Sequence, residues 1–254
     1  MTDIDAGQVS CLPLTGERTV PGVGHENYWF RRHEAAYLLL AGRCRDALVL
    51  EAGCGEGYGA DLIAGCARRV VALDYDPVTT AHVAAKYPSV TAVRGNLAAL
   101  PLADAALDVV MNLQVIEHLW DQRGFLAECA RVLRPSGQLL TSTPNRLTFS
   151  PGRDTPLNPF HTRELTAAEL ARLLAEAGFT VHEMLGLRHG PALRARDHAH
   201  GGSLVDAQVV VALDGGPWPA RLLADVAAVQ ADDFDIHGDK LDDSLDLIAI
   251  ARLA

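Results

Sequence analysis

Short apolar runs and amphipathic stretches alternate along most of this chain. The apolar runs at 48–53, 70–74 and 90–93 are typical of buried strands. After the first two, the spacing of apolar residues and a well-placed proline predict helices over 57–67 and 77–86. The same alternation continues with strands at 107–113, 138–143, 179–187 and 244–253, and with helices at 124–133 and 166–177. The pattern therefore predicts a sheet whose strands are linked by helices.

Continuous apolar strands that alternate with helices indicate a parallel sheet covered on both faces, the doubly wound α/β class. In such sheets ligands bind outside the carboxyl ends of the strands, so functional residues are expected where strands end. One further helix is predicted ahead of the first strand, over 33–45, with Leu38, Leu39 and Leu40 facing inward.

A chain of 254 residues, 49% of them hydrophobic, fits one large α/β domain with a modest insertion. One domain is expected over 15–254, after a tail at 1–14 that lacks periodicity. Its expected parts are an N-terminal cover for a bound ligand at 15–45, the core at 46–188, an inserted lid of helices and loops at 189–243, and a final strand at 244–254.

The charge of the chain narrows the range of partners. Net charge is −10, Lys86 and Lys240 are the only lysines, and no stretch gathers basic residues into a stripe. Nucleic-acid backbones and anionic membrane surfaces both select clustered positive charge, so neither is an expected partner. The amino terminus has no signal-peptide pattern, no apolar run reaches the roughly 20 residues of a membrane span, and the cysteines form no CxxC pair. These features predict a soluble cytoplasmic protein with reduced thiols.

The strongest chemical signal follows the first predicted strand. Its motif is Glu-Ala-Gly-Cys-Gly-Glu-Gly, which contains Glu51, Gly53, Gly55 and Gly57. The glycines allow a sharp turn and a close approach of ligand to backbone. Asp74 ends the second strand, where a carboxylate suits hydrogen bonds to ribose hydroxyls. Together they predict a cofactor site, although a glycine loop alone also serves as a plain strand-to-helix turn.

The motif Glu-x-Gly-x-Gly-x-Gly resembles motif I of the class I S-adenosylmethionine-dependent methyltransferases. Two later stretches resemble the same family, one at 95–102, which contains Asn96 and Leu97, and one at 112–119, which contains Gln114. The resemblance implies a Rossmann-like fold, with a mostly parallel sheet of seven strands and an antiparallel last strand.

The same resemblance implies S-adenosyl-L-methionine as the cofactor. It would place the methionine part at Gly53 and Gly55, the ribose at Asp74 and the adenine between Asn96 and Leu97. The cofactor residues are completed by Glu51, Gly57, Tyr75 and Gln114.

A longer set of phrases resembles one actinobacterial group within this family. The phrases at 15–21, 26–33, 114–121 and 149–165 resemble the mycobacterial 1-O-methyltransferases of methylmannose polysaccharide biosynthesis. This resemblance implies methylation of the anomeric hydroxyl of a short 3-O-methylated mannoside, with magnesium assistance. Resemblance to the wider family also implies that the region before the first strand closes over the cofactor, whose carboxylate would meet Tyr28, Arg32 or His33.

Methyl transfer from a sulfonium needs an aligned nucleophile, and an alcohol must also lose its proton. His118, just past the fourth strand, and His161, in the loop after the fifth, are the candidate bases. Each has a structural alternative, because His118 could orient its loop and His161 could hydrogen-bond within a proline-rich loop. Loop carboxylates could hold magnesium, but no spacing singles out a set, so the metal ligands are unassigned.

The tryptophans are candidates for the acceptor side. Aromatic rings stack well on the C–H face of a sugar, and Trp29, Trp120 and Trp218 are the only tryptophans. Core packing is the structural alternative for each of them, and Trp29 belongs to a denser cluster of aromatic and basic residues at 26–33.

Three other functions stay open at this level. A methyltransferase for another small natural product would share the cofactor half and differ in its acceptor. A module that binds S-adenosylmethionine without catalysis would keep Asp74 but tolerate loss of His118. A nicotinamide oxidoreductase is disfavoured, because no Tyr-x-x-x-Lys pair exists. A homodimer is expected from base rates alone.

Overall fold

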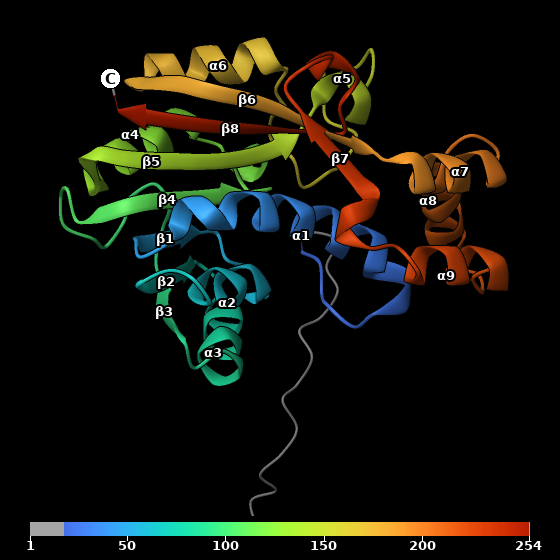
Figure 1. Ribbon diagram of the computed structural model, residues 1–254, viewed down its shortest axis with the longest axis horizontal. Helices are drawn as coiled ribbons and strands as arrows, with labels where there is room; N and C mark the ends of the chain where they lie inside the picture. Colours follow the sequence, from blue (N-terminus) through green and yellow to red (C-terminus); the bar gives the residue numbers. More distant parts are fainter. Residues whose placement is uncertain (1–17, 254) are drawn as a thin grey trace, which may run out of the picture.

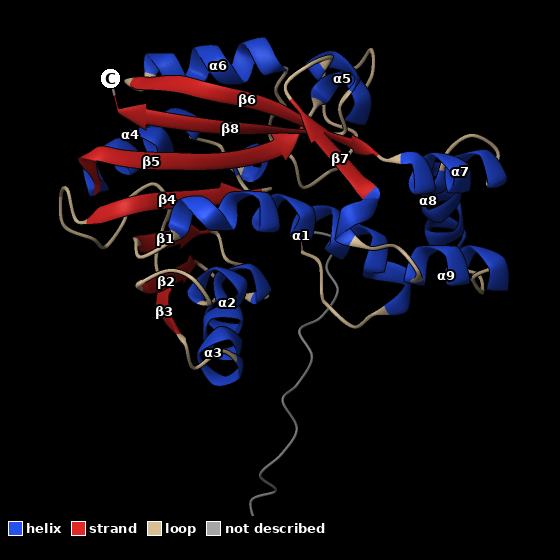
Figure 2. Cartoon of the chain, viewed as in Figure 1, coloured by secondary structure: helices blue, strands red, loops and turns tan. Residues whose placement is uncertain are grey.

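The computed structural model of the chain describes residues 18–253. Its strands are β1 (Leu48–Ala52), β2 (Arg69–Asp74), β3 (Val90–Arg94), β4 (Leu107–Leu113), β5 (Leu133–Pro144), β6 (Phe179–His189), β7 (Phe234–His237) and β8 (Asp246–Leu253). They form one eight-stranded sheet in the order β3-β2-β1-β4-β5-β8-β6-β7 (Figure 1; Figure 2). Neighbours among β1 to β5 pair in parallel, whereas β8 runs antiparallel to β5 and β6. The predicted Rossmann-like α/β fold with an antiparallel last strand is therefore confirmed.

Helices cover both faces of this sheet. They are α1 (Asn27–Ala41), α2 (Tyr58–Ala64), α3 (Pro77–Lys86), α4 (Gln122–Val132), α5 (Arg146–Phe149), α6 (Ala167–Glu176), α7 (Pro191–Ala199), α8 (Leu204–Asp214) and α9 (Ala220–Ala227). Buried side chains of α1, α2 and α3 belong to one hydrophobic core, and those of α4 and α6 belong to a second. The central strand β4 contributes side chains to both cores, since Val109 and Met111 face the first and Val110 faces the second.

Local signals explain why some elements match the sequence pattern closely. The side chain of Asp76 caps α3 by accepting hydrogen bonds from the N–H groups of Val78 and Thr79, and Pro77 takes the first helical position. Thr166 and Glu169 form a capping box at the start of α6. These helices begin where short-range chemistry starts them.

The helix predicted over 33–45 is observed as α1 at Asn27–Ala41, so its predicted ends are wrong. Two further predictions are wrong in detail. The sheet has eight strands rather than seven, because Phe234–His237 pairs antiparallel with the end of β6 inside the insertion. So short a strand, in an acidic stretch, gives no periodicity of its own. In α1, Leu40 is buried, but Leu38 and Leu39 are 54% and 42% exposed. Three consecutive residues cannot share one helix face, because each is rotated by about 100° from the last.

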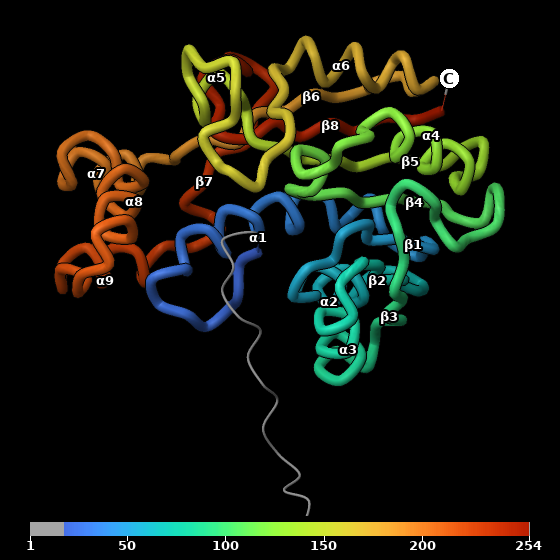
Figure 3. Tube along the Cα trace, turned by 180° about the vertical axis from the view of Figure 1, so that it is seen from behind, coloured from blue at the N-terminus to red at the C-terminus, as the bar shows by residue number. Residues whose placement is uncertain are grey.

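The inserted helices α7, α8 and α9 gather on the side to which the arrowhead of β5 points (Figure 1; Figure 3). The Asn27 amide on α1 helps to hold them, since it donates to the carbonyls of Val226, Ala227 and Val229 at 2.9–3.1 Å. This places the insertion at the edge of the sheet where the parallel strands end. None of the described helices is long and apolar enough to cross a membrane.

Candidate functional site

The loop between β1 and α2 contains three glycines that allow its sharp turn. Gly53, Gly55 and Gly57 have φ angles of 86°, 51° and 97°, in the left-handed region that residues with a Cβ rarely adopt. Space is limiting as well, because a Cβ added at Gly53 would lie 2.7 Å from the Val115 side chain. The N–H of Gly53 donates to the carbonyl of Leu73 at 2.8 Å, which ties the loop to the end of β2.

Asp74, the last residue of β2, lies beside this loop. Its Oδ2 accepts a hydrogen bond from the Gly55 N–H at 3.1 Å, and its Oδ1 accepts one from the Asp76 N–H at 3.0 Å. Burial raises the pKa of the Asp74 carboxyl, and the two N–H donors oppose this by stabilising the charged form. Each carboxylate oxygen has a second lone pair, so Asp74 can also accept hydrogen bonds from ribose hydroxyls.

The other predicted cofactor residues follow β2, β3 and β4. Tyr75 is 74% exposed, and Asn96 and Leu97 lie in a turn in which the Asn96 Oδ1 accepts a backbone N–H. Gln114 has a φ of 56°, and its N–H donates to the carbonyl of Ser142 at 2.9 Å. A left-handed non-glycine residue costs ~1 kcal/mol or more and is common at functional sites. Because the carboxyl ends of parallel strands lie at one edge of the sheet, the fold brings these residues to the same edge as the glycine loop.

Glu51, the first residue of the motif, faces the core. It is 2% exposed, and its carboxyl group accepts a hydrogen bond from the Tyr37 hydroxyl. Burial raises the pKa of Glu51 to about 8, and the hydrogen bond from Tyr37 acts in the opposite direction. The hydrogen bond from Tyr37 links Glu51, and with it the end of β1, to α1.

Tyr28 and Arg32 have partners other than those that the resemblance implies. Tyr28 is fully buried, and its hydroxyl lies 2.6 Å from the His189 Nε2. Arg32 is 4% exposed and makes two hydrogen bonds, of 2.7 and 2.6 Å, to the Asp246 carboxylate. Residues four apart share one helix face, and α1 turns this face toward β6 and β8. The expected cofactor contact of these two residues stays a prediction, and it requires each buried pair to open.

Arg18 is a basic residue that the sequence does not single out for this site. Its Nη1 donates to the Thr79 Oγ1 at 2.6 Å and lies 3.5 Å from the Asp76 Oδ2. Its Cβ lies 3.9 Å from the position that a Cβ would take at Gly55. Arg18 belongs to the leader phrase at 15–21, so the resemblance marks its segment, but only the fold places it over the glycine loop.

His118 and His161 meet on the acceptor side, with ring centroids 4.8 Å apart. The Nδ1 of His118 lies 3.0 Å from the Phe160 carbonyl oxygen, and that of His161 lies 2.7 Å from the Glu164 Oε1. A carbonyl and a carboxylate only accept, so each ring holds its proton on Nδ1 and a lone pair on Nε2. A general base needs this lone pair. The Asn158 amide donates to the Nε2 of His161 at 3.1 Å, so this lone pair of His161 already has a partner.

Glu117 forms a cluster with these two histidines. One ligand atom from each of Glu117, His118 and His161 lies within 4.8 Å of the other two. Glu117 is 1% exposed, and burial raises its pKa to about 8. Two imidazole nitrogens and one carboxylate are typical of zinc or iron sites, whereas Mg²⁺ prefers oxygen ligands. The donor set of this cluster does not fit the magnesium that the resemblance implies.

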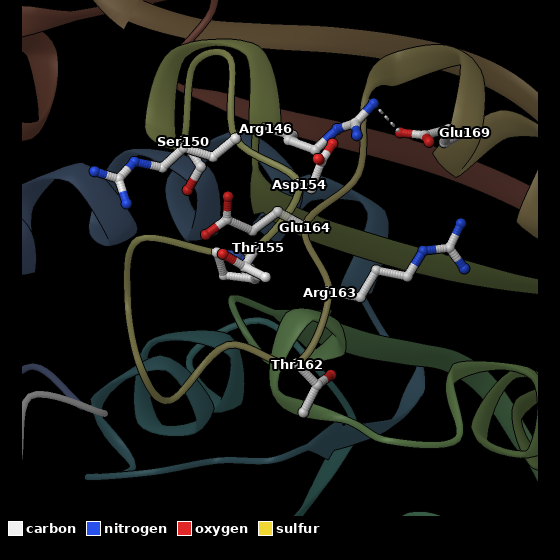
Figure 4. A pocket seen from close by; sticks show the side chains of 10 residues that line it. Arg146, Ser150, Asp154, Thr155, Thr162, Arg163, Glu164 and Glu169 are labelled. Carbon is white, nitrogen blue, oxygen red and sulfur yellow. Dashed lines mark ion pairs between the residues drawn. The ribbon is translucent and has the colours of Figure 1, made fainter.

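A pocket of about 270 Å³ is lined by α5, the loop after it and the start of α6 (Figure 4). One of its lining residues, Thr162, directly follows His161 of the cluster in the chain. Thr162 on its wall donates its hydroxyl to the carbonyls of Glu117 and Leu119, at 3.0 and 2.7 Å, which joins the pocket to the His118 loop. Guanidinium, carboxylate and hydroxyl groups line it in equal numbers: Arg146, Arg153, Arg163, Asp154, Glu164, Glu169, Ser150, Thr155 and Thr162. Balanced charge with many hydrogen-bonding groups suits a neutral, hydroxyl-rich ligand better than an anion.

Trp120 differs from the other tryptophans in its exposure to solvent. It is 93% exposed, whereas Trp29 and Trp218 pack partly buried against the first hydrophobic core. Phe160, whose carbonyl binds His118, is 43% exposed. Core packing therefore does not account for Trp120, and each histidine of the pair has an exposed aromatic residue within two positions in the chain.

Comparison with known proteins adds to this geometry. Residues 50–141 match a family model described as a methyltransferase domain. The chain is 64% identical to a probable S-adenosylmethionine-dependent methyltransferase of Mycolicibacterium smegmatis, with 99% of each chain covered. A protein of Mycobacterium tuberculosis with the same kind of name is 63% identical over 94% of this chain and 89% of its own length.

The fold also resembles a solved structure at low sequence identity. A SAM-dependent methyltransferase from Thermotoga maritima superposes with a TM-score of 0.60 and is 17% identical. The match covers 89% of this chain and 93% of that one. At this identity the likeness shows the fold alone.

Proposed function

Because the chain belongs to the class I S-adenosylmethionine-dependent methyltransferases, we propose that it methylates a hydroxyl of a short carbohydrate. The acceptor is a 3-O-methylated mannoside in polysaccharide biosynthesis, and the methylated group is its anomeric 1-OH. The observation that carries this proposal is the exposed Trp120, which follows His118 of the His118–His161 pair by two positions in the chain. An aromatic face next to a base suits a sugar that must be both stacked and deprotonated.

Cofactor binding falls to the residues at the ends of β1 to β4. S-adenosyl-L-methionine supplies an electrophilic methyl group when bound. Asp74 accepts hydrogen bonds from the ribose hydroxyls, and the tight turn at Gly53 and Gly55 accommodates the methionine part without side-chain clashes. Asn96 and Leu97 bracket the adenine. The remaining contacts come from Gly57, Tyr75 and Gln114, whereas Glu51 acts from the core side.

Acceptor activation falls to His118 in this proposal. Its Nε2 takes the proton of the reacting hydroxyl as the oxygen forms its new bond to the methyl carbon and the carbon–sulfur bond breaks. The Phe160 carbonyl holds the opposite ring nitrogen and so keeps the lone pair on Nε2. His161, fixed by Glu164, packs against the His118 ring and limits its rotation. No step is routed through magnesium, because the donor set does not fit it.

The polar pocket supports a neutral acceptor. Its equal numbers of arginines and carboxylates leave no net charge for a phosphorylated or nucleotide-activated sugar. Hydroxyl and guanidinium groups there can donate to sugar oxygens, while carboxylates accept from sugar hydroxyls.

The test is methyl transfer to defined mannosides. Purified protein and S-adenosylmethionine are incubated with short 3-O-methylated mannosides whose anomeric hydroxyl is either free or blocked. S-adenosylhomocysteine release is followed by chromatography, and NMR locates the new methyl group. We expect turnover with the free hydroxyl only, and a rise of about tenfold in the acceptor KM for Trp120→Ala that Trp120→Phe largely avoids. Cofactor binding without turnover of any mannoside would contradict the acceptor assignment.

A further inference from the structure

Glu56 is a buried charge inside the glycine loop, between Gly55 and Gly57. It is 2% exposed, and its carboxylate is directed to α3 and the residue that follows this helix. The Oε1 accepts hydrogen bonds from the His82 Nε2, at 2.9 Å, and from the Lys86 ammonium. The Oε2 accepts from the Tyr87 hydroxyl at 2.8 Å. Three side chains from one helical segment therefore hold one carboxylate of the loop.

The groups that hold Glu56 are themselves fixed. The Lys86 ammonium lies 5.1 Å from the centroid of the Tyr87 ring, within range of a cation–π contact. A Cβ added at Gly57 would lie 2.8 Å from the Val83 side chain and 3.0 Å from that of Tyr87. The end of the glycine loop is therefore packed against α3 without spare room.

The same helix also reaches the ribose side of the site. Asp76 caps the start of α3, and its N–H donates to the Asp74 carboxylate at 3.0 Å. Asp74 in turn accepts from the N–H of Gly55, the neighbour of Glu56. One end of α3 thus fixes Asp74, and the other end fixes the loop that Asp74 binds.

We propose that Glu56, held by His82, Lys86 and Tyr87, is a positioning residue that sets the affinity for the adenosyl cofactor. It does not touch the cofactor. A buried carboxylate without partners is costly, so losing one partner favours movement of Glu56 toward water. That movement displaces Gly55 and Gly57 relative to Asp74, and the cofactor loses its preformed site. The proposal rests on the cofactor assignment and is independent of the acceptor.

The test compares S-adenosylhomocysteine binding by calorimetry in full-length variants. Lys86→Met removes the ammonium from a side chain that is 35% exposed, and we expect the Kd to rise about tenfold. Lys86→Arg, which keeps a cationic donor, should restore most of the affinity. Arg43→Met is the matched control, because Arg43 is 33% exposed and pairs with Glu183, away from the glycine loop. This control should bind like the wild type.

Kinetics separate positioning from a general loss of structure. For Lys86→Met we expect a higher KM for S-adenosylmethionine, with kcat at saturating cofactor and the acceptor KM close to wild type. Glu56→Gln should weaken binding in the same direction. An unchanged Kd in both Lys86→Met and Glu56→Gln would overturn the positioning role alone. Failure of the wild-type protein to bind S-adenosylhomocysteine would instead overturn the cofactor assignment and this proposal with it.

Discussion

The cofactor half, β1 to β3 with α2 and α3, and the acceptor half, the segments after β4 and β5 with α7–α9, are held together differently. In the cofactor half the key contacts span short stretches of chain, 19 residues from Gly55 to Asp74 and 26 from Glu56 to His82. In the acceptor half His118 binds Phe160 across 42 residues. The two buried contacts that tie α1 to β6 and β8 span 161 and 214 residues.

This difference in the chain separation of the contacts has consequences for the function of each half. A site built from neighbouring β–α units has its geometry set by the units themselves, so the cofactor half can be common to many enzymes. A site built from distant loops depends on the packing of the whole domain, and its loops can change without altering the strands that carry them. The acceptor half is therefore where the specificity of this chain is expected to lie.

The largest expected effect breaks the long-range contacts. Arg32→Met leaves the buried Asp246 carboxylate without its partner, which should cost about 4 kcal/mol of unfolding free energy. Denaturant unfolding measures this loss. Replacing both residues, as Arg32→Met with Asp246→Leu, should be much less damaging, since no unpaired charge remains. A single variant as stable as the wild type would show that the stability of the fold does not depend on this pair.

The second effect is a loss of kcat without a loss of cofactor affinity, which distinguishes the acceptor half from the cofactor half. His118→Gln removes the base, and kcat should fall about a thousandfold while the Kd of S-adenosylhomocysteine stays close to wild type. Steady-state kinetics and calorimetry on the same preparation measure both quantities. Retained kcat would exclude His118 as the base, and weakened cofactor binding would show that the two halves are coupled.

The third effect targets the cofactor half. Asp74→Ala should weaken S-adenosylhomocysteine binding about a hundredfold, because it removes charge-assisted hydrogen bonds to the ribose. The stabilisation of the protein by this ligand in a thermal shift should largely disappear. Asp61→Ala, at an exposed acidic position in α2, is the control and should keep the full shift. If S-adenosylhomocysteine still stabilised Asp74→Ala fully in the thermal shift, Asp74 would not be the residue that binds the ribose.

The fourth effect, the smallest when it is counted for a change of one pH unit, concerns the pH dependence of the cofactor half. Folding raises the pKa of Glu51 from an ordinary 4.5 to about 8, so the folded state keeps a proton that the unfolded state releases. This contribution to stability is complete below pH 4.5 and is lost as pH rises through about 8, at no more than about 1.4 kcal/mol per pH unit. Glu51→Gln should flatten this part of the stability profile measured by denaturant unfolding. A slope equal to that of the wild type would contradict it.

Local chemistry made much of the fold predictable. The strand predicted over 107–113 and the helix over 77–86 match β4 and α3 in full, because apolar runs and a proline with an aspartate cap act at short range. The glycine motif and Asp74 could also be placed at strand ends, since parallel strands end at one edge. The roles of Tyr28 and Arg32 could not be predicted, because their partners lie in the last third of the chain.

The sequence by itself determined the alternation of strands and helices, the glycine turn after β1 and the carboxylate that ends β2. These features follow from backbone sterics and hydrophobic burial, which act on residues near one another in the chain. Only the tertiary structure decided that His118 contacts His161 and that Trp120 is exposed. It also decided that Glu56 accepts a hydrogen bond from the residue that follows α3, and that β7 extends the sheet. Such contacts form only when the packed core brings distant segments within hydrogen-bonding distance, and no local pattern encodes that distance.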